Sequence, residues 1–143
     1  MVKAELVAAK LAQLADRIDR IEQHRPASLA ALAANRDALD LLSFNLLLAV
    51  QVCADVAAHL ISDEGLPPAP NLAQSFARLH EHGVIGDAVV GPIQRAVGLR
   101  NVVAHGYERI DPNMVYQAAT VGIADLKAFA ADVARWLQHK RSA

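Results

Sequence analysis

Apolar residues at alternating steps of four and three positions are the feature that most restricts how this chain can fold. In the N-terminal segment the stripe comprises Val7, Leu11, Leu14, Ile18 and Ile21. In the C-terminal segment it comprises Val115, Ala119, Gly122, Leu126, Phe129, Val133 and Trp136. This spacing places the members of each stripe on one face of an α-helix. Both segments are therefore predicted to be amphipathic helices that bury these faces.

Composition favours helix in the remainder of the chain as well. Ala and Leu are abundant, aromatic residues make up only 4%, and β-branched residues are scattered rather than gathered in alternating runs. We therefore expect an all-α fold with almost no strand. The length of 143 residues and the 54% hydrophobic content suit one domain with its own core, so residues 1–143 are predicted to be a single domain.

The next boundary falls near a proline. The first helix is expected to end near Pro26, and Ser28 can cap a second helix. Because residues 29–62 contain no glycine or proline, the sequence predicts one uninterrupted helix of about 30 residues there.

A loop and a short helix are expected to follow. The loop is forced by Gly65, Pro67, Pro68 and Pro70. Asn71, with Gln74 three positions later, has the form of a capping box, and the helix that it begins should stop at Gly83.

Two more helices complete the expected set of five. One runs from about residue 87 to residue 105, and within it Gly91 and Pro92 are expected either to kink the helix or to delay its start. Gly106 would end this helix in a left-handed cap. The last helix should begin at Asp111-Pro112, because aspartate accepts from free N–H groups and proline suits the first turn.

The charge balance limits how the chain could bind nucleic acid. Fourteen Lys and Arg against fifteen Asp and Glu give a net charge of -1, so there is no global positive field. Any contact with nucleic acid must depend on a local site. Cys53 is the only cysteine, which excludes an intrachain disulfide, fits a reducing compartment and predicts a small buried hydrophobe.

Neither export nor membrane insertion is expected. Charged residues interrupt the N-terminal segment: Lys3, Glu5, Lys10, Asp16 and Arg17. The most hydrophobic stretch, residues 41–50, contains Ser43 and Asn45 and has about half the length of a membrane span. It is predicted to be a core helix, and the protein is predicted to be cytoplasmic.

The segment from Gly98 to Tyr107 concentrates the side chains that carry chemistry. It holds a cation, an amide, an imidazole and a phenol: Arg100, Asn101, His105 and Tyr107. Metal-independent RNA cleavage needs a base for the 2′-hydroxyl proton, an acid for the leaving 5′-oxygen, and a cation for the developing phosphorane charge. Arg100 and His105 have the right types. Asn101 could orient the histidine or a phosphate oxygen, and Tyr107 could donate to phosphate or stack on a base.

The spacing of Arg100 and His105 does not by itself build a site. Five residues on an ideal helix correspond to about 140° of rotation and about 7.5 Å of rise. The two side chains could converge if His105 lies at the end of its helix, or if a second copy of the chain supplies the missing member across a dimer axis. The helix dipole favours an imidazolium and Arg100 opposes it, so the protonation state of His105 is left open.

A polar pair in the predicted second helix is a further candidate. Gln51 and Asp55 lie one turn apart among valines. They either line a cleft or form a solvated or interhelical hydrogen-bonding pair. The remaining histidines lack metal-ligand spacing, so no metal site and no cofactor are predicted; they are His24, His59, His80, His82 and His139.

With these motifs the chain resembles the HEPN superfamily, and within it the HepT toxins of MNT/HepT toxin–antitoxin pairs. The resemblance covers roughly the central half of the chain. It runs through Gln51-x-x-x-Asp55-x-x-x-His59, the Pro-rich turn, Ser75-Phe76-x-x-Leu79, Gly83-Val84-Ile85, Leu99 to Tyr107, Ile110-Asp111 and Val115-Tyr116. It implies an antiparallel helical bundle that dimerises with its Arg-x-x-x-x-His motifs facing a shared cleft, and a metal-independent endoribonuclease activity.

The resemblance also implies roles for individual residues. Arg100 and His105 would be catalytic, Asn101 their supporting polar neighbour, Asp55 a secondary site residue, and Tyr107 the phenol of the motif. The chain would be the toxin of a type VII system. Its partner, an MNT-type nucleotidyltransferase antitoxin, would transfer AMP from ATP to that tyrosine. The added bulk and phosphate charge beside Arg100 would repel an RNA backbone.

Two departures from the family pattern accompany the resemblance. Gly91-Pro92 interrupts the motif helix, and the segment up to about His24 matches less closely.

Two other hypotheses stay open. The near-neutral charge also suits a non-catalytic helical partner that binds a nucleotide or substrate for a nucleotidyltransferase. A purely structural interpretation makes the motif a helix cap and dimer contact.

Overall fold

Six α-helices make up the described part of the chain in a computed structural model. The structure describes residues 2–105 and 110–142, without the side chains of 2, 3, 101–105, 141 and 142. The helices are α1 (Val2–His24), α2 (Leu29–Ala33), α3 (Arg36–Asp63), α4 (Leu72–Glu81), α5 (Asp87–His105) and α6 (Pro112–Ser142). No strand occurs in these ranges, which confirms the predicted all-α fold.

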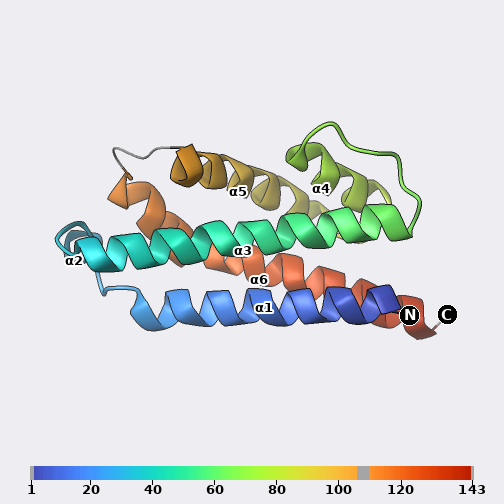
Figure 1. Cartoon of the computed structure of the whole chain (residues 1–143), viewed down its shortest axis with the longest axis horizontal. Coiled ribbons are helices and arrows are strands. Elements are labelled where there is room, and N and C mark those ends of the chain that lie inside the picture. Colours follow the sequence, from blue (N-terminus) through green and yellow to red (C-terminus); the bar gives the residue numbers. More distant parts are fainter. Residues whose placement is uncertain (1, 106–109, 143) are drawn as a thin grey trace.

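The long helices form an antiparallel bundle around α3. Figure 1 shows α1 and α3 running in opposite directions, as do α3 and α5, and then α5 and α6. Among the described residues, α3 is the one helix that contacts each of the other five. Its most extensive packing is against α1.

The central place of α3 explains its apolar sequence. By length and composition alone, this helix could cross a membrane, but 56% of its most apolar window is buried inside the protein. A helix that is apolar on most sides is expected in a core as well as in a bilayer. Leu42, Leu46, Ala49 and Val50 are all buried, which confirms the core helix predicted for this stretch.

The prediction of one uninterrupted helix over residues 29–62 is wrong. Ser28 caps α2 as expected, since its Oγ accepts from the amide of Ala31 at 3.1 Å. The helix then ends, because Asn35 adopts an extended conformation (φ -124°, ψ 94°) and its side chain accepts from the amide of Ala38 at 3.0 Å. Asparagine favours this capping role over a place inside a helix. The cap starts α3 and gives six helices in place of five.

The other predicted boundaries of the first half are confirmed. α1 ends at His24, just before the proline. The Asn71 side chain accepts from the amide of Gln74 at 2.9 Å and begins α4. Gly83 has a φ of +81°, the left-handed conformation that glycine adopts most readily after a helix.

Pro92 lies inside α5 without delaying its start. The amide of Val90 already bonds to the carbonyl of Gly86 at 3.2 Å, two residues before the proline. The predicted cap at Gly106 lies outside the described residues. At the start of α6, Asp111 accepts from the amide of Asn113 at 2.9 Å, which confirms that boundary.

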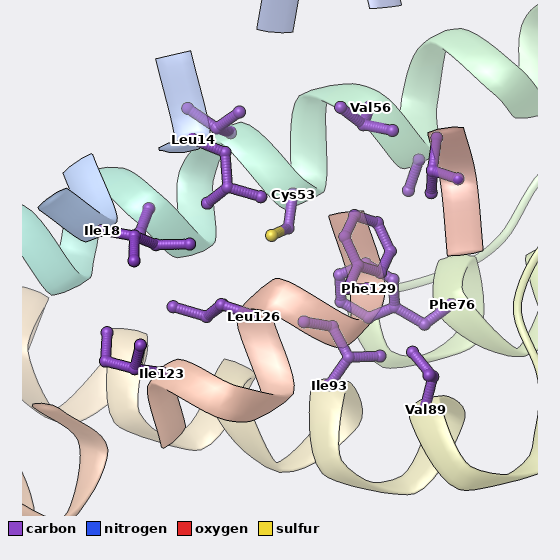
Figure 2. Close-up of a cluster of buried hydrophobic side chains, with 14 of the residues drawn as sticks. Leu14, Ile18, Cys53, Val56, Phe76, Val89, Ile93, Ile123, Leu126 and Phe129 are labelled. Carbon is purple, nitrogen blue, oxygen red and sulfur yellow. The ribbon is translucent and has the colours of Figure 1, made fainter. Parts of the chain in front are cut away.

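One apolar core includes side chains from all six described helices. Figure 2 shows side chains of α1, α3, α4, α5 and α6 packed together in this core, which contains the rings of Phe76 and Phe129. These two rings lie 5.6 Å apart in an edge-to-face arrangement. Cys53 is fully buried, and burial raises the pKa of its thiol, which confirms its prediction as an inert core residue.

The C-terminal ends of three helices meet at Glu64. This residue caps α3, and its carboxylate lies 2.7 Å from Lys140 Nζ of α6 and 3.3 Å from His82 Nε2, which caps α4. The hydrogen bond from Lys140, followed by that from His82, lowers the pKa of Glu64. The charged form of Glu64 therefore stabilises this junction.

Removing the Phe129 ring should destabilise the bundle. We expect Phe129→Ala to lower the free energy of unfolding by about 3 to 5 kcal/mol, because it opens a cavity in the core. On the same helix, Val121 is 63% exposed, so Val121→Ala should change stability by less than about 0.5 kcal/mol. Chemical denaturation of both variants checks this, and comparable losses would contradict the assigned core.

The Glu64 junction predicts a pH-dependent contribution to stability. Because the folded-state pKa is lowered, the contribution is present above the ordinary carboxyl pKa and is lost as the pH falls through the lowered value. Glu64→Gln should therefore lower the free energy of unfolding by roughly 1 kcal/mol near neutral pH and by less near about pH 3. Urea titrations at both pH values test this, with Glu81→Gln, 63% exposed, as control. An equal loss at both pH values would be inconsistent with it.

Candidate active site

Arg100 connects the motif helix to the centre of the bundle. It lies in the C-terminal third of α5 with its side chain partly exposed. One guanidinium nitrogen donates to Oε1 of Gln51 on α3 at 3.3 Å. The same Gln51 side chain donates from Nε2 to Oδ1 of Asp55 at 3.1 Å. The other oxygen of Asp55 accepts from Lys10 Nζ of α1 at 3.4 Å.

These contacts form one polar chain across three helices, Arg100–Gln51–Asp55–Lys10. Figure 1 shows α5 and α1 on opposite sides of α3, so the chain crosses the face of α3 from one neighbour to the other. Its central link is the i, i+4 pair on α3. Of the two alternatives left open for Gln51 and Asp55, the structure shows the hydrogen-bonding pair, and this pair bonds to both neighbouring helices.

The two hydrogen-bonded α3 residues also line a hollow. A groove of about 460 Å³ lies between α1 and α3, and its lining includes Gln51, Asp55 and Arg17. A second groove of about 640 Å³ is lined by residues of α3, α5 and α6, among them Val50 and Leu99. Val50 and Gln51 are consecutive, as are Leu99 and Arg100.

The electrostatics of Arg100 follow from the nature of its partner. Within the described part of the chain, no carboxylate lies within ion-pair distance of this guanidinium. Gln51 is neutral, so it orients Arg100 without cancelling its charge. A guanidinium has five N–H donors, so a further anion can be bound. This arrangement suits stabilisation of negative charge on a phosphate oxygen.

The remaining motif residues are placed only in part. The described part of α5 extends through His105. Its side chain and that of Asn101 lie outside the described residues, and so does the whole of Tyr107. Positions five residues apart on an ideal helix are separated by about 140° of rotation, so they do not share one narrow face.

Two histidines outside the motif, His80 and His82, pair with carboxylates. His80 Nε2 lies 2.6 Å from Asp87 Oδ1, and His82 contacts Glu64. In the described ranges no group of three His, Cys, Asp or Glu side chains could hold a metal ion.

Lys10 is the residue that sequence reasoning missed. It lies 45 positions from Asp55, so no local spacing could connect the two. The one available signal is its position beside the apolar stripe of α1, three residues after Val7, where a long cation can reach the neighbouring helix.

Known proteins resemble this chain in sequence and in structure. The mRNA nuclease HepT of Shewanella oneidensis is 24% identical over 90 residues, which cover 63% of this chain and 68% of that protein. The tri-AMPylated HEPN toxin of the same organism, solved in complex with an MNT antitoxin, superposes with a TM-score of 0.82 at 22% identity and covers 90% of this chain and 96% of its own. YutE of Bacillus subtilis, a cytosolic protein of unknown function, gives 0.83 at 10% identity, with 95% and 91% covered.

A family model extends the match over most of the sequence. Residues 14–133 fit the model described as ribonuclease HepT-like. The match begins inside α1 and ends inside α6, so it includes the capped start of α3, Gln51, Asp55 and the whole of α5. The chain therefore belongs to the ribonuclease HepT-like family.

Proposed function

We propose that this protein is a metal-independent endoribonuclease and the toxin of a toxin–antitoxin pair. The observation that carries the proposal is Arg100. It stands in an intact Arg-x-x-x-x-His-x-Tyr motif at the end of α5, hydrogen-bonded to a neutral amide and retaining its charge. Membership of the ribonuclease family and similarity to an mRNA nuclease support it.

Each motif residue has a role in the proposed reaction. The 2′-oxygen of the RNA attacks the adjacent phosphorus, and the bond to the 5′-oxygen breaks, which gives a 2′,3′-cyclic phosphate and a 5′-hydroxyl. His105 transfers protons to or from these oxygens, and Arg100 stabilises the charge that develops on the phosphorane. Asn101 orients the histidine or a phosphate oxygen.

A homodimer completes this site. Positions five apart on an ideal helix do not share one narrow face, so a second copy would supply the missing members across a shared cleft. Two histidines in that cleft would provide one acid and one base. Each 143-residue chain would act as one domain.

Control of the toxin is proposed to act through Tyr107. A nucleotidyltransferase antitoxin of the MNT type would transfer AMP from ATP to this phenol, in the cytoplasm where ATP and RNA are both present. The AMPylated toxin of S. oneidensis, bound to an MNT antitoxin, supports the pairing. A phosphate two residues after His105 would compete with RNA for Arg100 and repel the backbone.

A non-catalytic role is the second candidate. The net charge of -1 suits a helical protein that binds a nucleotide or substrate for a nucleotidyltransferase. It predicts neither growth arrest nor RNA degradation when the chain is expressed alone.

Loss of a motif side chain should abolish RNA cleavage. We expect His105→Ala to reduce the cleavage rate at least ~100-fold, because proton transfer in the transition state is lost, and Arg100→Ala to act similarly through the phosphorane charge. Purified dimer and a fluorescent RNA oligonucleotide give the measurement, with His139→Ala, at an exposed position on α6, as control. Wild-type rates in a folded His105→Ala variant would reject the catalytic assignment.

AMP transfer is expected at Tyr107 and not at Tyr116. On co-expression with an MNT-type nucleotidyltransferase, intact mass should show AMP increments in the wild-type chain and none in Tyr107→Phe. Tyr116→Phe is the matched control, since Tyr107 and Tyr116 are the two tyrosines of the chain and Tyr116 is partly buried on α6. AMP increments that persist in Tyr107→Phe would place the modification elsewhere.

A further inference from the structure

We infer that Lys10 and Asp55 are positioning residues for Arg100, and that they act through the amide of Gln51. The inference rests on the proposed ribonuclease function and adds α1 to the machinery of the site. It starts from three contacts in series, of 3.3, 3.1 and 3.4 Å, that join α5 to α1. Each step follows from which groups can donate and which can only accept.

Only one orientation of the Gln51 side-chain amide allows hydrogen bonds to both Asp55 and Arg100. A carboxylate only accepts hydrogen bonds and a guanidinium only donates them. Asp55 therefore selects the NH₂ end of the amide, and this turns the carbonyl oxygen toward Arg100. If the amide rotated by half a turn, both contacts would be lost together. Asp55 thus fixes the acceptor that holds the catalytic cation.

Lys10 fixes Asp55 in turn. The two side chains are 23% and 37% exposed, so the pair is only partly screened by water. Lys10 holds the carboxylate oxygen that Gln51 does not use, which defines the rotation of the carboxyl group. It also balances the negative charge one helical turn from Gln51. Without it, that carboxylate would attract the guanidinium away from a substrate phosphate.

The charges of the four side chains from Lys10 to Arg100 together favour anion binding. Lys10 and Arg100 are positive, Asp55 is negative and Gln51 is neutral, which leaves one net positive charge. The Lys10–Asp55 pair lies at the α1 end, so among these four side chains the unbalanced positive charge is at Arg100. The side chain on α1 therefore contributes to phosphate recognition without touching the phosphate.

Single-turnover cleavage of a defined RNA by the purified full-length dimer tests this relay of contacts from Lys10 through Asp55 and Gln51 to Arg100. Lys10→Met and Asp55→Asn should each reduce the rate at saturating RNA about tenfold, the effect of losing one oriented contact. Asp55→Asn preserves size but admits both amide orientations of Gln51. Lys10→Arg should restore most of the activity, because it keeps the charge beside Asp55.

Controls separate positioning from a loss of folding. Lys127→Met removes another ion pair to α1, that with Glu22 at 3.1 Å, and should leave cleavage unchanged. Melting temperatures are measured for all variants. If Lys10→Met does not fold, Asp55→Asn carries the test. Cleavage at the wild-type rate by folded Lys10→Met and Asp55→Asn would overturn the inference.

A double-mutant cycle tests the route through Gln51. In a Gln51→Ala background, Lys10→Met should have no further effect, because the link is already broken. Additive losses would overturn the relay. A shallower dependence of RNA binding on salt in Lys10→Met would also overturn it, since this would mean that Lys10 contacts phosphate directly.

The outcomes distinguish the relay from the proposed function. If the wild-type dimer does not cleave RNA, or if cleavage survives in His105→Ala, the proposed function fails. If wild type is active, His105→Ala is inactive and Lys10→Met is fully active, the function stands and the relay fails.

Discussion

The fold and the candidate site both depend on the burial of α3. This helix contacts each of the other five, and most of its apolar surface is covered by them. Burial of each large aliphatic side chain contributes about 1.5 to 3 kcal/mol, so the bundle is organised by the demand to cover α3. After its first turn, what remains exposed on it is a narrow strip at steps of four and seven residues, which comprises Asp40, Phe44, Gln51, Ala58 and Ser62. The site lies along this strip, because there a polar α3 side chain can meet α1 and α5 together.

The prediction of the fold was most accurate where information is local. The stripes of α1 and α6 were readable from the sequence because one amphipathic face repeats along each helix. The caps at Asn71 and Asp111 were equally readable, because a cap acts within three residues. The break before α3 was not foreseen. Asn35 has no glycine or proline beside it, so the local sequence does not indicate a helix end there. The break depends on tertiary packing, because the chain turns to bring Leu32 into the core.

The site was predictable to the same extent and for the same reason. Gln51 and Asp55 lie one turn apart, so their mutual hydrogen bond could be anticipated from spacing alone. The motif residues were recognisable because all four lie within eight consecutive positions. Lys10 could not be found this way, since its contact depends on how α1 docks against α3. A residue that is defined by tertiary packing has no signature in the sequence next to it.

A neutral partner for Arg100 has a consequence for chemistry on phosphates. A carboxylate in place of Gln51 would hold the guanidinium more tightly, but it would also cancel most of its charge before an RNA arrived. An amide fixes direction and leaves the charge in place, and the charge of the nearest carboxylate is balanced on its far side by Lys10. Under the proposed function, the same uncompensated cation serves two anions in turn. It stabilises the phosphorane during cleavage, and it binds the phosphate of an adenylated Tyr107 when the toxin is silenced, so the group that makes the site active also makes it inhibitable.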